Sequence, residues 1–161
     1  MESRAKLVGH PIHQMLIVFP LGLLATALLF DVVQMVTGNG YWSEIPFWLI
    51  AAGVLTGLLA APFGLVDWLA IPSGTRAKRI GAIHGAGNVV VLALYGLSWL
   101  MRIGSASSPE VPALALAFLG GGLAMVTGWL GGELVDRLAV GVDDGANLDA
   151  PSSLRARRVR G

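Results

Sequence analysis

Four long apolar segments constrain the fold of this 161-residue chain more than any other feature. A helix that crosses a membrane needs about 20 apolar residues at a rise of about 1.5 Å per residue. Segments of that length occur at about residues 11–36, 45–70, 80–101 and 111–134. They lack the alternation of apolar and polar residues that membrane-spanning strands show. The sequence therefore predicts an all-α integral membrane protein.

Short connections, rich in residues that break helices, separate the apolar segments. The stretches at residues 37–40, 71–74 and 104–109 each contain glycine, proline or both. Because short links join antiparallel neighbours, the helices are predicted to form an up-down-up-down four-helix bundle within residues 1–139. Residues 140–161 are polar and are expected to form a partly disordered tail on the cytoplasmic side.

Positive charge is distributed unevenly between the two sides that this topology creates. Charged residues make up only 13% of the chain and the net charge is +1, which gives no basis for expecting a nucleic-acid partner. Of the 11 Lys and Arg residues, only Arg102 falls on one side. The other side holds Arg4, Lys6, Arg76, Lys78, Arg79, Arg137, Arg155, Arg157, Arg158 and Arg160. The positive-inside rule therefore predicts that both termini are cytoplasmic.

Ionisable residues inside membrane helices are energetically costly, so their positions are the best guide to a functional site. His13, Asp67 and His84 are predicted to lie near the positively charged side, whereas Asp31 lies about 27 Å from His13 along the first helix. Asp67 ends a series of small residues that suits close helix packing. We expect His13, Asp67 and His84 to face one cavity, with Asn88 on the same helix face as His84.

Prolines mark one helix start and two interior positions. Since proline suits the first helical position, Pro11 predicts that His10 is the N-cap of the first helix. Pro20 and Pro62 lie inside apolar segments and are predicted to kink the helices or to cap a discontinuity. The residues that follow these two prolines are alike (Leu-Gly-Leu and Phe-Gly-Leu), but such short similarities are too few to establish an internal repeat.

A histidine-based haem or metal site is the functional interpretation that the sequence favours. Neutral imidazole binds haem iron and first-row metals. His13 and His84 lie on helices that run in the same direction and could hold a b-type haem between them. Alternatively, a divalent metal could be held by His10, His13, Asp67 and His84, with Asn88 and Asp31 in supporting roles. The protein would then be a membrane redox module, with a redox protein or a second copy of itself as partner.

Two alternative functions are kept beside this one. The first is a non-catalytic membrane subunit or scaffold in which the buried histidines are structural. The second is proton or ion conduction, ranked lower because few ionisable groups occupy the middle of the helices. The sequence has no phosphate loop, dinucleotide fingerprint, nucleophile elbow or zinc-protease helix, and no cysteine for thiolate chemistry. These absences favour a protein that is not an enzyme on its own.

Five ordered blocks of the sequence stand out, at Gly9–His13, Phe19–Gly22, Asp67–Arg76, His84–Asn88 and Gly128–Leu134. Together they resemble the predicted membrane proteins grouped as domain of unknown function 2231. The resemblance covers roughly Gly9 to Val142 and implies a bacterial plasma-membrane protein of this helical design, without a settled activity. Some relatives are joined to Rieske-type iron–sulfur domains, which implies redox surroundings. Asp136-Arg137-Leu138 departs from the family pattern, so the resemblance assigns no role to that segment.

Overall fold

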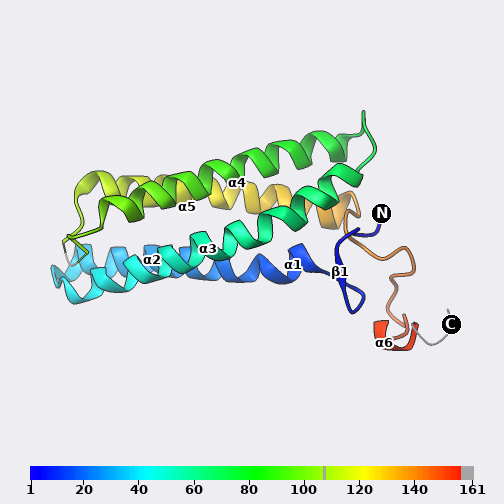
Figure 1. Ribbon diagram of the computed structural model, residues 1–161, viewed down its shortest axis with the longest axis horizontal. Coiled ribbons are helices and arrows are strands. Elements are labelled where there is room, and N and C mark those ends of the chain that lie inside the picture. The colour runs from blue at the N-terminus through cyan, green and yellow to red at the C-terminus, as the bar shows by residue number, and fades with distance from the viewer. Residues whose placement is uncertain (107, 157–161) are drawn as a thin grey trace.

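The computed structural model is a bundle of long helices and describes residues 1–106 and 108–156 (Figure 1). Its main elements are α2 (Val18–Thr37), α3 (Tyr41–Ala70), α4 (Arg76–Met101) and α5 (Val111–Gly132). Each helix packs against the next and α5 returns to α2, which closes the bundle. The prediction of an all-α, up-down-up-down four-helix fold is confirmed.

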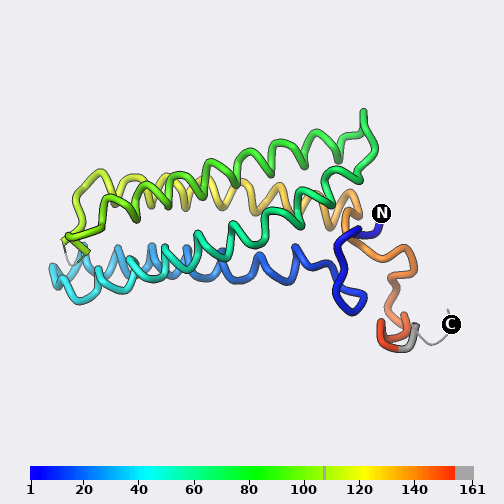
Figure 2. The backbone as a smooth tube through the Cα atoms, in the orientation of Figure 1, coloured from blue at the N-terminus to red at the C-terminus, as the bar shows by residue number. Residues whose placement is uncertain are grey.

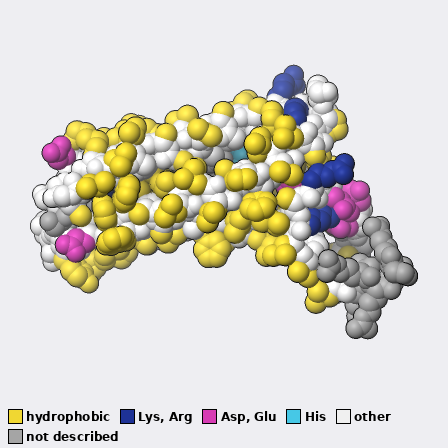
Figure 3. Space-filling model, in the orientation of Figure 1, with side chains coloured by type: hydrophobic (Ala, Val, Ile, Leu, Met, Phe, Trp, Pro, Cys, Tyr) yellow, Lys and Arg dark blue, Asp and Glu magenta, His cyan; other side chains and the backbone are white. Residues whose placement is uncertain are grey.

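The surface of the bundle is apolar along most of its length. The four candidate membrane spans are Ile12–Thr37, Tyr41–Ala70, Arg76–Met101 and Val111–Arg137, each long and apolar enough to cross a bilayer. Large apolar side chains such as Leu29, Leu55 and Met125 point outward and are mostly exposed. Figure 3 shows this apolar cover over the body of the bundle, with charged side chains gathered at its two ends. Lipid is the solvent that such a surface requires, so the protein is a multi-pass membrane protein.

The first span is divided into two helices near its start. Helix α1 (Ile12–Leu16) is separated from α2 by one residue, Ile17. Pro20 has no amide hydrogen to donate to the carbonyl of Leu16, which accounts for the interruption at this point. Proline thus causes a discontinuity here, as its position in the sequence predicts.

An antiparallel hairpin of strands β1 (Lys6–Leu7) and β2 (His10–Pro11) precedes α1. Val8 and Gly9 form its turn with φ angles of 51° and 88°. Two consecutive positive φ angles are what a two-residue hairpin turn of type I′ requires. Helix α1 has Pro11 as its N-cap, so the prediction that His10 caps the helix was wrong. The hairpin fold pairs His10 with Leu7 instead.

The core of the bundle depends on small residues that let the helices approach closely. Its centre consists of Leu24, Ala27, Ile50, Val91, Tyr95 and Ala117. A Cβ atom at Gly57 would come within 2.6 Å of Leu92 Cδ2, so α3 and α4 pack at this glycine. Close backbone approach of this kind is typical of membrane helices, which gain little from hydrophobic contact with one another in lipid.

The carboxyl-terminal segment follows a π-helix, η1 (Glu133–Arg137), that continues α5. As far as Ala156, where the described residues end, this segment contains the short helix α6 (Ser153–Ala156) and lies at the same end of the bundle as the amino terminus (Figure 2). Three of the arginines that predict sidedness, Arg157, Arg158 and Arg160, lie outside the described residues.

Candidate functional site at the basic end of the bundle

The amino terminus, the carboxyl-terminal segment as far as Ala156 and most described Lys and Arg side chains lie at one end of the bundle, here called the basic end (Figures 1 and 3). It comprises the amino-terminal hairpin, the loop between α3 and α4, and η1. The opposite end, here called the far end, comprises the loops that join α2 to α3 and α4 to α5. The residues predicted to form a site are divided between these ends.

His13 lies on α1 at the basic end and is half-buried against α3. Its Nδ1 atom is 3.0 Å from the carbonyl oxygen of Ala60. Because a carbonyl can only accept, Nδ1 carries the hydrogen and donates it, which leaves the lone pair of a neutral ring on Nε2. A Cβ atom at Gly64 would come within 2.8 Å of His13 Cε1. Gly64 therefore provides the space that the imidazole occupies.

His84 lies on α4 and is held by α5 in the same way. Its Nδ1 atom donates to the carbonyl oxygen of Thr127 at 2.8 Å. Gly131 lies under the ring, where a Cβ atom would come within 3.1 Å of His84 Cε1. The Asn88 amide lies 3.2 Å from His84 Nε2 and also donates to the His84 carbonyl. Thr127 Oγ1 donates to Asn88 Oδ1 at 3.0 Å, which orients the amide so that its NH₂ group faces Nε2.

The metal site predicted from four ligands is not assembled among the residues that the structure describes. No three His, Asp or Glu side chains of this part of the chain come together as a possible metal-ligand group. His10 is exposed in β2, where its Nε2 atom lies 3.4 Å from Ser153 Oγ. The two-imidazole version of the site, with His13 and His84 alone, stays a prediction.

Asp67 is buried at the basic end, but its partners belong to the amino-terminal segment. Ser3 Oγ lies 2.8 Å from each carboxylate oxygen, and the backbone amides of Arg4 and Ala5 donate to Oδ1 at 2.7 and 3.4 Å. The described residues include no hydrogen bond between Asp67 and either imidazole of the predicted cavity. The hairpin turn folds residues 3–5 back over the end of α3, which explains why the carboxylate finds donors there.

Asp31 lies at the far end, where it forms an ion pair that the sequence interpretation missed. Arg102 donates through both Nη atoms to the two oxygens of Asp31, at 2.8 and 2.7 Å. Both side chains have an exposed fraction of 0%, and Arg102 Nε lies 3.3 Å from Ser98 Oγ. Arg102 stands out in the sequence as the single basic residue on its side. That isolation was the available signal for a buried partner of Asp31.

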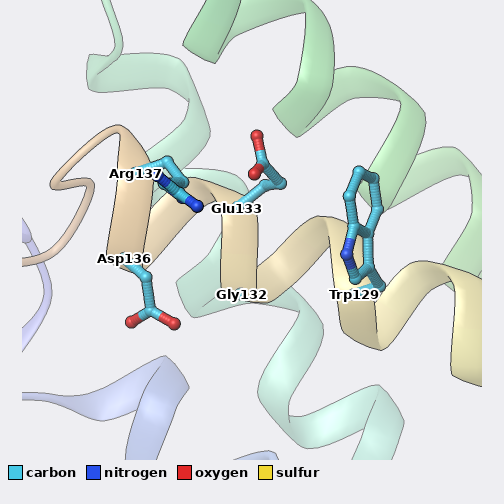
Figure 4. Close-up of a pocket in the computed structure, with 5 residues that line it drawn as sticks. All are labelled: Trp129, Gly132, Glu133, Asp136 and Arg137. Atoms are coloured by element: carbon cyan, nitrogen blue, oxygen red, sulfur yellow. The ribbon is translucent and has the colours of Figure 1, made fainter.

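A shallow depression of about 210 Å³ lies beside η1 and is lined by Trp129, Gly132, Glu133, Asp136 and Arg137 (Figure 4). Glu133 and Asp136 extend to opposite sides of the helix. Glu133 accepts a hydrogen bond at 2.6 Å from Arg76 at the start of α4. This contact joins η1 to α4.

The fold and this arrangement define a class of protein: a multi-pass membrane protein of four helices, with two histidines set into one end of the bundle. The chain belongs to the DUF2231 family, described as a predicted membrane protein, whose model matches residues 9–144. The match spans the whole bundle and confirms the family resemblance. No curated protein and no solved structure matches the chain.

Proposed function

We propose that the protein is a membrane-embedded redox module in which His13 and His84 bind a metal-centred cofactor, with a b-type haem as the preferred ligand. The observation that carries the proposal is the shared hydrogen-bonding pattern of the two rings. Each imidazole donates from Nδ1 to a backbone carbonyl of the neighbouring helix. Metal-ligating histidines are oriented in this way, because the bond holds the ring and raises the basicity of the other nitrogen.

Two imidazoles suit haem iron better than they suit a metal site made only of protein ligands. Axial ligation needs two neutral nitrogen donors, since the porphyrin supplies the rest. A small divalent ion needs three or four protein ligands, and the described residues hold no such group. Coordination at His84 would require the Asn88 amide to leave Nε2. When bound, haem would transfer one electron at a time, which fits a redox protein as partner.

Haem and metal content of the purified protein tests this proposal. Full-length protein is expressed with a haem precursor and purified in detergent, and haem and transition metals are then measured per chain. We expect about one haem per chain, and His13→Ala and His84→Ala should each lower this at least about tenfold. His10→Ala is the matched control and should keep the full content, because His10 lies in the exposed hairpin. Wild-type protein without haem or metal, or full content in both variants, would contradict the proposal.

The alternative function is a membrane subunit or scaffold with structural histidines. The same contacts favour it, since the backbone carbonyls and the glycines beneath the rings also satisfy purely structural side chains. In that case His84→Ala would lower the free energy of unfolding by about 1–3 kcal/mol and would change no spectrum. Conduction receives less support, because Asp31 is fully engaged by Arg102 at the far end.

We also propose that the basic end faces the cytoplasm of a bacterium. Arg4, Lys6, Arg76, Lys78 and Arg79 lie at this end, and the positive-inside rule assigns such an end to the cytoplasm. Reporter fusions after Arg76 and after Arg102 test the orientation. A cytoplasmic signal is expected at the first position and an external signal at the second. The reverse result would overturn it.

A further inference from the structure

Contacts across the bundle repeat at a constant spacing along the chain. Tyr95 Oη on α4 donates to the carbonyl oxygen of Leu24 on α2, and these residues are 71 positions apart. Arg102 and Asp31, which form the buried ion pair, are also 71 positions apart. His13 and His84, which hold the same hydrogen bond from Nδ1, differ by the same number.

The partners of the two histidines repeat in the same manner on α3 and α5. Residues 60 and 127, which supply the carbonyl groups, and residues 64 and 131, the glycines under the rings, differ by 67 in both cases. Two more glycines follow this spacing. Gly53 packs on the side chains of residues 23 and 24, and Gly120 packs on those of residues 94 and 95. Each of these contacts in one half thus has a counterpart in the other.

Burial and residue identity also repeat at the spacings of 71 and 67 residues. Buried counterparts on the first and third spans are Leu24 and Tyr95, Ala27 and Ser98, and Asp31 and Arg102. Those on the second and fourth are Pro46 and Ala113, Ile50 and Ala117, Gly53 and Gly120, Ala60 and Thr127, and Asp67 and Leu134. Identical residues stand at Ile12 and Ile83, His13 and His84, Val18 and Val89, Leu21 and Leu92, Leu23 and Leu94, and Leu29 and Leu100.

We infer that the chain is a tandem duplication of one helical hairpin, folded on itself as a pseudo-symmetric dimer. A two-fold axis that runs along the bundle between α2 and α4 relates the first half, α1 to α3, to the second half, α4 and α5. In a two-fold interface, the residues on the axis contact their own counterparts. Leu24 with Tyr95 and Asp31 with Arg102 are such pairs. The surface between the hairpins is therefore an interface between two duplicated copies of one hairpin.

The ion pair on the axis determines which hairpins can assemble. Equivalent positions carry opposite charges, so a first hairpin can form this bond only with a second hairpin. Two first hairpins would place Asp31 against another aspartate, and two second hairpins would place Arg102 against another arginine. A desolvated pair of like charges opposes such assemblies. Asp31 and Arg102 are thus the residues that specify pairing within the chain.

Exchanging the two charged residues tests the inference. Asp31→Arg and Arg102→Asp should each lower the folded yield of full-length protein in detergent at least about tenfold, because like charges then share a buried site. The double variant should recover much of the yield. Any ion pair could recover in this way, so Ser98 supplies the specific test. Its hydroxyl contacts Arg102 Nε, and its counterpart is Ala27.

Duplication predicts that Ala27→Ser with Ser98→Ala raises the yield and melting temperature of the charge-exchanged protein further. In the wild-type background the same two substitutions should lower both, because they remove the hydroxyl from Arg102. A charge-exchanged protein that folds no better than the single variants, or that gains nothing from the serine exchange, would overturn the inference.

A second exchange involves no charge and keeps the test valid if all charge variants misfold. Leu24→Tyr with Tyr95→Leu moves the aromatic ring to its counterpart position on the axis. Its melting temperature should lie closer to wild type than that of Tyr95→Leu alone. The matched control, Leu23→Tyr with Tyr95→Leu, places the ring one residue away from the axis and should not recover. Equal behaviour of the two exchanges would contradict the duplication, whether or not any cofactor binds.

Discussion

The ionisable residues at the two ends of the bundle differ in burial and in hydrogen bonding. At the far end, Asp31 and Arg102 are fully buried and joined by two hydrogen bonds of 2.8 and 2.7 Å. At the basic end, His13 and His84 are half-buried and each is held by one bond to a backbone carbonyl. The far end satisfies its charges internally. At the basic end the bond to the carbonyl leaves Nε2 of each ring for a ligand, although at His84 the Asn88 amide would first have to leave Nε2.

This difference separates a structural role from a ligand-binding role. A bidentate pair without solvent has no atom left for a ligand, and breaking it exposes an uncompensated charge. A ring that is oriented through Nδ1 can bind through Nε2 without losing that bond. Substitutions at the far end should therefore affect stability, and substitutions around the histidines should affect binding.

The largest effect is expected at the far end. Arg102→Leu should lower the free energy of unfolding by about 3–5 kcal/mol, because the Asp31 carboxylate is left buried and unpaired. Removing both charges, with Asp31→Leu and Arg102→Leu, should restore much of that loss. Reversible unfolding in detergent, followed by circular dichroism, measures both. If Arg102→Leu were as stable as wild type, the ion pair would not stabilise the far end.

An intermediate loss of stability is expected from a substitution at Gly64, which lies under the His13 ring. Gly64→Ala would place a Cβ atom within 2.8 Å of His13 Cε1, so the ring must move and the bond to Ala60 must weaken. We expect a loss of about 1–3 kcal/mol and a lower content of any bound cofactor. Gly22→Ala is the control, because a Cβ atom there meets nothing within 4 Å. Equal stability of the two variants would argue against a fitted ring.

A smaller effect is expected where the amino terminus covers Asp67. Ser3→Ala removes a hydroxyl that lies 2.8 Å from both carboxylate oxygens, but the backbone amides of Arg4 and Ala5 still donate. A loss of about 1 kcal/mol is expected, together with faster proteolysis of the hairpin. Cofactor content should not change. A lower cofactor content in Ser3→Ala would show that Asp67 contributes to the ligand site.

The smallest effect concerns the exposed charges of the amino terminus and the tail. A hydrogen bond from the Gly145 amide, with help from Lys6, lowers the pKa of Asp143 below its usual value. Ionised Asp143 therefore contributes stability above its usual pKa near 3.8, and the contribution is lost as the pH falls through the lower folded value. A slight decrease in melting temperature below about pH 4 is expected, and it should be smaller in Asp143→Asn. A large decrease would indicate stronger coupling of tail and bundle.

Most of the fold could be predicted from the sequence because lipid imposes a simple rule on helix length and polarity. The depth of His13 and His84 followed from the same rule. The bond between Asp31 and Arg102 did not, since hydropathy places a residue at a depth but does not pair it with another helix. Their spacing of 71, shared with the two histidines, was present in the sequence. The short similarity noted in the sequence follows Pro20 and Pro62. These prolines lie on adjacent helices, so that similarity does not point to the spacing of 71.

The surroundings of Asp67 could not be predicted from helix patterns at all. Its donors come from residues 3–5, which reach the end of α3 only because Val8 and Gly9 turn the chain back on itself. A positive φ at a valine is an uncommon conformation that sequence alone does not indicate. Pairing a carboxylate with an imidazole was the simplest expectation, and the backbone turn provided a different set of donors.

The central claim is that the basic end offers two imidazole ligands, His13 and His84. The reduced-minus-oxidised absorption spectrum of membranes containing the full-length protein tests this claim most directly. Wild-type protein and Arg102→Lys, which retains the charge at the far end, should both show the visible bands of a haem with two axial histidines, in proportion to folded protein. His13→Ala and His84→Ala should lose these bands to the same extent while remaining folded. Bands that survive either histidine substitution, or that never appear in the wild type, would contradict the account.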